Sequence, residues 1–233
     1  MRNKRIVRWL VVVVFATVVG GLRAADNELT PAEKKGGWIL LFDGKSMKDW
    51  MTSEWQRCDE ALNDESISPD RCNTYMMTYE RPWSDFILAL DFKIGAHTNS
   101  GIFVRTFPLK PLPGWDVGYN GIEIQILDSQ TAGYYDTGAL YDLVKPTKNA
   151  MKPVGEWNHV QITCNKNLID VVLNGAHVNH MNLDLWTRPY MRPDGTAHKF
   201  NIAFKYHSRM GYVGLQKHGG NCWFKNIKLK PLG

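Results

Sequence analysis

Apolar and polar residues alternate in most segments of the chain after residue 85. This period of two is typical of β-strands, whose successive side chains point to opposite faces of a sheet. Clusters of Gly, Pro, Asn and Asp separate the segments, as expected for turns between strands. The predicted strands are 86–94, 101–106, 121–127, 159–164, 167–173, 199–204, 211–216 and 224–229.

Turn signals support an antiparallel arrangement. Asn174-Gly175 predicts a type I′ hairpin, because both central residues of that turn need positive φ. Helical periodicity is confined to short turns in 30–37 and 181–186. Strands joined by hairpins and loops predict an all-β sandwich or barrel. The segments GEWNHVQIT, IDVVLNGAHV, GYVGLQKHGG and FKNIKL resemble the concanavalin-like or laminin-G-like fold. This resemblance implies a jelly-roll sandwich of two antiparallel sheets, the concave one often carrying a carbohydrate site.

Residues 1–24 have the pattern of a secretory signal peptide. A basic start, MRNKRIVRWL, leads into the apolar run WLVVVVFATVVGGL, and small residues follow near Ala24 and Ala25. An uncleaved anchor is the alternative, although the run is short for a span of roughly 20 apolar residues. We therefore expect an exported protein, periplasmic or extracellular. Its mature form would be a single β-sandwich domain, residues 25–233, without a membrane span.

Cleavage of the leader changes the charge balance. The whole chain has 28 Lys and Arg against 23 Asp and Glu. The leader holds no acid and five of the basic residues, which are Arg2, Lys4, Arg5, Arg8 and Arg23. The mature domain is thus formally neutral and lacks the clustered positive charge that nucleic-acid binding requires.

Four cysteines remain in the mature domain, and four allow three pairings. Cys58 and Cys72 flank a polar segment that has the composition of a loop insertion, so a bridge closing this loop is the favoured pairing. Cys164 and Cys222 lie in or beside predicted strands. A bridge between them and two buried free thiols are equally open alternatives. No cysteine or histidine spacing indicates structural zinc.

Three predicted strands present polar side chains opposite their apolar residues. These side chains are Asn99 and Arg105 in NSGIFVRT, Glu123 and Gln125 in GIEIQILD, and Gln216 and His218 in GYVGLQKHG. They form a cluster if the three faces belong to one sheet surface, and they are ordinary solvated residues if those faces meet bulk water. Neighbouring glycines and the loop tyrosines 134, 135 and 141 favour a site, since aromatic rings offer apolar platforms for sugars.

The spacing of Glu123, Gln125 and Asp128 resembles the ExDxxE signature of laminarinase-like glucanases. That signature brings its third residue onto the same face through a bulge in the strand. A retaining glycosidase needs two carboxyl groups about 5–5.5 Å apart. Here an amide replaces the middle acid and the last acid is one carbon shorter, which disfavours ordinary retaining hydrolysis.

A more specific resemblance covers Gly36 to Leu232. Six motifs occur in order, namely GGWILLFDGKSMKDW, NSGIFVRT, GIEIQILD, TGALYDLVKPTKNAMKPVGEWNHV, LNG and GLQKHGGNCWFKNIKLKPL. Together they resemble the 3-keto-disaccharide hydrolase family, which implies action on 3-keto-glycosides as a hydrolase or as a 1,2-lyase and hydratase. The chain departs from the family pattern in the Cys58–Cys72 segment and in Asn221-Cys222.

The implied chemistry needs few groups. A ketone at C3 acidifies the hydrogen at C2, so one general base can start β-elimination of the C1 substituent. A cation or hydrogen-bond donor must stabilise the enolate. The resemblance makes Glu123 the expected base or metal-binding carboxylate. Arg105 and His218 are expected to stabilise the enolate or to assist the leaving group.

The remaining candidates would bind the sugar. Gln125 and Asn99 would orient hydroxyl groups, Asp128 would join them if the strand bulges, and Tyr141 and Lys148 could close over the ring. A divalent metal ion could replace the cation as electrophile. The ligand types are available in Glu123, Asp128, His97 and His218, but no spacing fixes a metal site.

Two rival functions stay open. A non-catalytic, lectin-like carbohydrate-binding module would explain the sandwich and the loop aromatics. A conventional endoglucanase would explain the spacing in GIEIQILD but is disfavoured by Gln125.

Overall fold

The computed structural model describes residues 25–106 and 121–233, and the predicted leader lies outside these residues. Its one α-helix among them is α1 (Pro31–Lys35), and its 3-10 turns are η1 (Asp59–Ala61), η2 (Pro69–Arg71), η4 (Leu183–Leu185) and η5 (Phe204–Tyr206). The strands are β1 (Ile39–Leu40), β2 (Trp50–Thr52), β3 (Leu62–Asn63), β4 (Ser66–Ile67), β5 (Met76–Tyr79), β6 (Phe86–Ile94), β7 (Asn99–Thr106), β8 (Ile122–Leu127), β9 (Asn158–Asn165), β10 (Leu168–Leu173), β11 (Ala176–Asn182), β12 (Tyr212–Gln216) and β13 (Cys222–Pro231).

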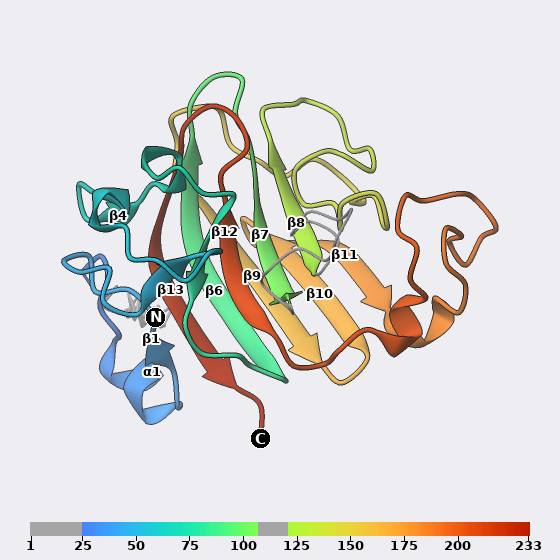
Figure 1. Ribbon diagram of the computed structural model, residues 1–233, viewed down its shortest axis with the longest axis horizontal. Helices are drawn as coiled ribbons and strands as arrows, with labels where there is room; N and C mark the ends of the chain where they lie inside the picture. The colour runs from blue at the N-terminus through green and yellow to red at the C-terminus, as the bar shows by residue number, and fades with distance from the viewer. Residues whose placement is uncertain (1–24, 107–120) are drawn as a thin grey trace, which may run out of the picture.

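The strands form two antiparallel sheets that lie face to face (Figure 1). The eight-stranded sheet has the order β11-β10-β9-β6-β13-β4-β3, with β1 pairing to β13. The five-stranded sheet has the order β2-β5-β12-β7-β8. No helix within the described ranges is long and apolar enough to cross a membrane. This arrangement confirms the predicted all-β jelly-roll sandwich.

Alternation of side chains places the apolar core between the two sheets. Ile122, Ile124 and Ile126 of β8 are at most 2% exposed and point inward. Phe92 of β6 and Val160 of β9 in the eight-stranded sheet lie close to Ile124 and Ile126 and are at most 2% exposed. The intervening residues of β8 therefore point away from the core, onto the outer face of the five-stranded sheet.

Most predicted elements are confirmed, including the hairpin between β10 and β11. Asn174 and Gly175 have φ of 50° and 80°, as a type I′ turn requires. The prediction of a strand at 199–204 is wrong, because this segment is irregular and ends in η5. The short strands β2 and β5 were not predicted.

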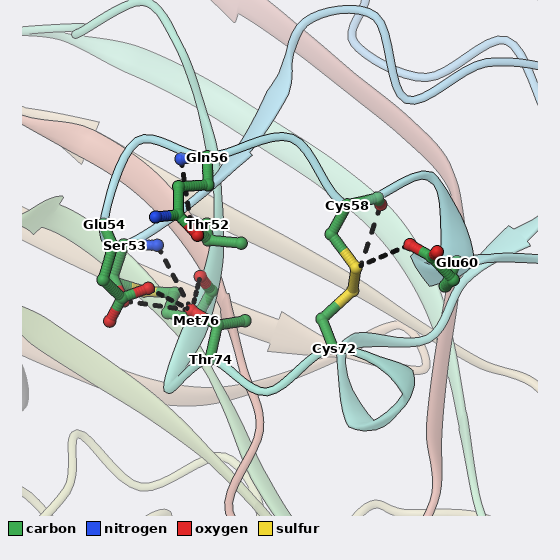
Figure 2. The surroundings of a disulfide bond; sticks show 9 residues. All are labelled: Thr52, Ser53, Glu54, Gln56, Cys58, Glu60, Cys72, Thr74 and Met76. Atoms are coloured by element: carbon green, nitrogen blue, oxygen red, sulfur yellow. Dashed lines mark hydrogen bonds between the residues drawn. A yellow bond between two sulfur atoms is a disulfide. The ribbon is translucent and has the colours of Figure 1, made fainter.

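The disulfide Cys58–Cys72 is confirmed, with the two Cα atoms 6.3 Å apart (Figure 2). It closes the segment that contains η1, β3, β4 and η2. Cys164 and Cys222 are buried free thiols, and burial raises the pKa of Cys164 to about 12. Neither free cysteine is therefore a reactive thiolate at neutral pH.

Candidate functional site

One row of residues crosses the outer face of the five-stranded sheet. Thr78 pairs with Gly214, Gly214 with Phe103, and Phe103 with Glu123. Beyond β8, the backbone N–H of Tyr141 donates to the carbonyl of Glu123 at 2.9 Å. Glu123 is thus flanked by Phe103 on one side and by Tyr141 on the other.

The carboxyl group of Glu123 is held over a glycine. A Cβ atom built on Gly101 would overlap Oε1 of Glu123 and would lie 2.8 Å from its Cγ. Glu123 is 8% exposed, so its carboxyl group is largely withdrawn from water. A carboxylate in such surroundings and in a fixed orientation is suited to proton abstraction.

Two buried amides lie on the same face. Gln125 donates from Nε2 to Oδ1 of Asn99 at 3.0 Å, and Gln216 donates from Nε2 to the hydroxyl of Tyr75 at 2.7 Å. Gln125 is 1% and Gln216 4% exposed, yet Oε1 of each has no partner among the described residues. Buried polar atoms without a partner are costly. These two oxygens are thus ready acceptors for the hydroxyl groups of a ligand.

A small apolar cluster lies beside the two amides. Met76 and Phe103 are fully buried on this face, with Tyr75 and Tyr212 packed against them. The rings of Tyr75 and Phe103 meet edge to face at 6.1 Å between centroids. The face therefore combines apolar ring surface with hydrogen-bonding groups, which is the usual composition of a small-molecule site.

A cation lies beside Tyr141. Nζ of Lys199 is 4.5 Å from the centroid of the Tyr141 ring. The backbone N–H of Lys199 donates to Oδ2 of Asp142 at 2.8 Å. Asp142 is itself paired with the buried Arg192, whose Nη2 lies 2.6 Å from Oδ1. This network fixes the backbone that carries Lys199 next to the Glu123 row.

Arg105 does not share the face of Glu123, which corrects the expectation from alternation. The register of β7 against β12 shifts at this point, and Arg105 has φ of 54°. This bulge turns the side chain away, and the guanidinium instead contacts Asp85 at 3.0 Å and the carbonyl of Ser84. Arg105 is fully buried. Burial lowers its pKa, which the charge of Asp85 opposes.

Asp128 also departs from the expectation. The pairing of β7 with β8 is regular from Asn99–Leu127 to Val104–Ile122, so β8 has no bulge. Asp128 therefore keeps the parity of the core-facing isoleucines. Its Oδ2 accepts from the backbone N–H of His97 at 2.8 Å and stabilises the turn between β6 and β7.

His218 and Lys148 lie farther from Glu123. The segment after β12 bridges to Asn99 through Gly219, and Asn99 pairs with Leu127, four positions along β8 from Glu123. Four positions correspond to about 13 Å, so the exposed His218 lies at the amide end of the face. Lys148 is exposed in a loop held to β11 by the Thr147 N–H.

The possible metal ligands do not converge. Glu123 and Asp128 have opposite parity in β8, and Asp128 is engaged by His97. Within residues 25–106 and 121–233, no group of three or more His, Cys, Asp and Glu side chains is placed to hold a metal ion.

A cavity of about 890 Å³ lies on the other side of the sandwich, between the N-terminal segment and the outer face of the eight-stranded sheet. Several of its charged groups are already paired with one another. Asp91 accepts from His159 at 2.6 Å and from Asn226 at 2.7 Å, and Lys225 pairs with Asp26. These contacts attach the N-terminal segment to β13. We therefore place the candidate site at Glu123, near the two amide oxygens that have no partner among the described residues.

Comparisons with known proteins identify relatives of the whole domain. A curated relative, the 3-keto-disaccharide hydrolase of Bacteroides thetaiotaomicron, is 26% identical over 91% of this chain and 84% of its own length. A crystal structure from Parabacteroides distasonis, provisionally named a glycosyl hydrolase, is 31% identical, with a TM-score of 0.70 over 84% of this chain and 99% of that one. A second such structure from that organism, 23% identical with a TM-score of 0.74, covers 90% of this chain and all of that one, and shows the same fold.

The match extends over nearly the whole sandwich. The model of the 3-keto-alpha-glucoside-1,2-lyase-like domain covers residues 37–230, which include every strand of both sheets except the last residue of β13. The chain therefore belongs to the 3-keto-alpha-glucoside-1,2-lyase-like domain family.

Proposed function

We propose that this protein is an enzyme that cleaves 3-keto-glycosides, with Glu123 as the general base. The observation that carries the proposal is the single withdrawn carboxyl group over Gly101, beside two amides with unpartnered oxygens. Family membership and the named relative support the substrate class. A β-elimination needs one base and no second carboxylate, which agrees with an amide at position 125.

The reaction would begin with transfer of the C2 proton to Glu123. The electron pair left at C2 delocalises onto the C3 oxygen as an enolate, which then expels the C1 substituent. The leaving oxygen takes up a proton, and a 3-keto-2-hydroxy-glucal remains. Addition of water across its C1–C2 double bond gives the free 3-keto sugar, so elimination and hydration together amount to hydrolysis.

Other groups on the face would position the sugar and its charge. Lys199, beside Tyr141, is the cation that we assign to the enolate oxygen in place of Arg105, which lies off this face. Tyr141 would cover the ring next to Glu123. Gln125, held by Asn99, would accept a hydroxyl group, and His218 would reach the far end of the ligand. No step is assigned to a metal ion or to Asp128.

The decisive experiment incubates the purified protein with 3-keto-trehalose and with methyl 3-keto-glucoside, each with and without EDTA. Release of sugar or methanol is expected, and deuterium should enter C2 in D₂O. Glu123→Gln should lower turnover by at least about 10²-fold, the low end for loss of a general base, with an unchanged circular dichroism spectrum. An unaffected rate in this variant would show that another group is the base.

The rival functions give different results in the same assay. A lectin-like module would bind an unmodified glycan and form no product from either keto sugar. An endoglucanase would hydrolyse unoxidised β-glucan. Restoration of activity by a metal after EDTA treatment would show that a divalent ion supplies the electrophile instead of Lys199.

We also propose that the protein is exported. The disulfide Cys58–Cys72 supports this, because such bonds persist in oxidising compartments. Expression of the full chain should give periplasmic or extracellular protein whose N-terminus lies at residue 25 or 26. Recovery of the intact N-terminus from the membrane fraction would instead show an anchor.

A further inference from the structure

Trp55 extends the outer face beyond the residues of the proposed chemistry. Its side chain is 40% exposed. Its ring meets Tyr212 edge to face, with 5.6 Å between the centroids. Tyr212 packs in turn on the Met76–Phe103 cluster, and Phe103 pairs directly with Glu123. A series of packing contacts therefore leads from Phe103, beside the base, to Trp55.

The backbone holds Trp55 in a conformation that few large residues adopt. Its φ is 62°, in the left-handed region that favours glycine. Its N–H donates to the carbonyl of Thr52 at 2.9 Å. Gln56 closes the turn by donating to Oγ1 of Thr52 at 3.0 Å and accepting from the Thr52 N–H at 2.8 Å. Such strain persists where the surrounding structure enforces it, and it concentrates at functional sites.

Residues that follow the disulfide in the chain also support this turn (Figure 2). Glu54 accepts hydrogen bonds from Oγ of Ser53 and Oγ1 of Thr74, each at 2.9 Å. The Ser53 N–H also donates to the carbonyl of Met76 at 2.9 Å. The turn is thus tied to the start of β5, next to the apolar cluster, so Trp55 has a fixed position relative to the face.

The separation suits a second sugar ring. Tyr212 is on β12, and β7 lies between β12 and β8. Two inter-strand spacings, combined with the two-residue offset of Tyr212 from Gly214 along β12, amount to about 12 Å, roughly the length of two linked pyranose rings. An exposed indole packed edge to face on a tyrosine offers the apolar platform on which a neutral sugar ring stacks.

We propose that Trp55 and Tyr212 form the subsite for the second ring of a 3-keto-disaccharide. The inference rests on the proposed function, since the first ring must lie over Glu123. It assigns to the turn before the disulfide a role in selecting disaccharides over simple glycosides.

The test compares KM and kcat on 3-keto-trehalose and on methyl 3-keto-glucoside, which has no second ring. Trp55→Asn should raise KM for the disaccharide about five- to tenfold, the loss expected for one stacking contact. The kcat of this variant for the disaccharide should stay within about twofold of the wild-type value. Its KM and kcat for methyl 3-keto-glucoside should do the same. Trp55→Phe should keep most of the affinity, and Tyr206→Ala, which removes a tyrosine that is 80% exposed elsewhere, should change nothing.

Thermal stability separates recognition from a merely structural role. Asn tolerates positive φ better than Trp, so Trp55→Asn should melt at the same temperature as the wild type or higher. A lower melting temperature with equal losses on both substrates would overturn the inference and indicate a folding role. Unchanged KM and kcat of Trp55→Asn on both substrates would also overturn the inference. Failure of the wild-type protein to cleave either substrate would refute the proposed function itself, and the subsite with it.

Discussion

Glu123 keeps its orientation because the residue beneath its carboxyl group lacks a side chain. Gly101 lies within the regular part of β7, where any residue could satisfy the backbone. The need for glycine there is therefore steric, since a Cβ would occupy the volume of the carboxyl group. Because this requirement concerns only Glu123, it can be tested without disturbing the sandwich.

Gly101→Ala should lower kcat by about 10- to 10²-fold, since displacing a general base by an ångström weakens proton transfer. Stability should change little, because Ala costs less conformational entropy in a strand than Gly. Steady-state kinetics measure the change in kcat, and thermal melting measures the change in stability. Gly95→Ala is the control, as its Cβ would meet no atom closer than 3.7 Å. Full activity in Gly101→Ala would show that the carboxyl group is free to move.

Alternation predicted the positions of Glu123, Gln125 and Asn99 because β7 and β8 pair without a shift over these residues. Alternation gave the wrong face for Arg105, because β7 has a bulge there that no residue type in the sequence indicates. Lys199 could not be found in this way, because a long loop brings it to Tyr141. The importance of Gln216 became apparent only once Oε1 proved to be buried without a partner.

The bulge in β7 removes the Arg105 side chain from the candidate site and places it in a buried ion pair with Asp85. Arg105 is fully buried, whereas Asp85 retains 22% side-chain exposure. Asp85 also accepts from the backbone N–H of Lys166 at 2.9 Å. The pair therefore joins the end of β7 to the turn between β9 and β10, and so connects the two sheets.

Asp85→Ala should destabilise the domain by about 3 kcal/mol, because it leaves the Arg105 charge buried without its partner. For a domain of this size, this corresponds to a fall in Tm of roughly 6–12 °C. Asp184→Ala removes the exposed pair with Arg209 and should cost less than about 1 kcal/mol. Urea unfolding of both variants measures the difference. Equal losses would mean that the Arg105 pair contributes no more than a surface contact.

The segment 199–204 shows why period two is an incomplete signal. Phe200 and Phe204 pack with Trp186 and His198 in a cluster of rings rather than in a sheet, with 5.4 Å between the two Phe centroids. Backbone bonds within the preceding loop, such as Tyr190 N–H to the carbonyl of Phe200, replace those of a strand. Apolar residues that alternate because they pack in such a cluster cannot be distinguished in the sequence from those of a strand.

The stability of the whole domain should depend on pH through His207. Burial lowers the pKa of His207 to about 4, and its Nε2–H donates to the carbonyl of Arg105 at 2.9 Å. The ring is thus neutral when folded, whereas it binds a proton near pH 6.5 when unfolded. Stability is complete above pH 6.5 and falls as the pH drops towards 4. The loss in free energy of unfolding has an upper bound of about 3 kcal/mol. The actual loss is smaller than this bound, because the partly exposed ring retains some hydration.

Urea unfolding at intervals between pH 7 and pH 4.5 measures this dependence. His207→Gln retains an N–H donor for the Arg105 carbonyl and removes the titrating group. Its stability should therefore change less over the same interval than that of the wild type. Identical slopes in the two proteins would assign the pH dependence to other groups, such as His198, whose pKa is also lowered by burial.

The glycine beneath Glu123 also has an evolutionary consequence. A single nucleotide change in the codon of Gly101 introduces a side chain, and no second change is needed to displace the base. The sheets, the ring surface and the amides on the outer face would all survive such a step. On the proposed mechanism, a gene copy that drifted in this way would encode a stable protein that still holds its sugar but turns it over much more slowly. Selection could then retain that copy as a binder, so enzyme and lectin would be neighbours in sequence space on this scaffold.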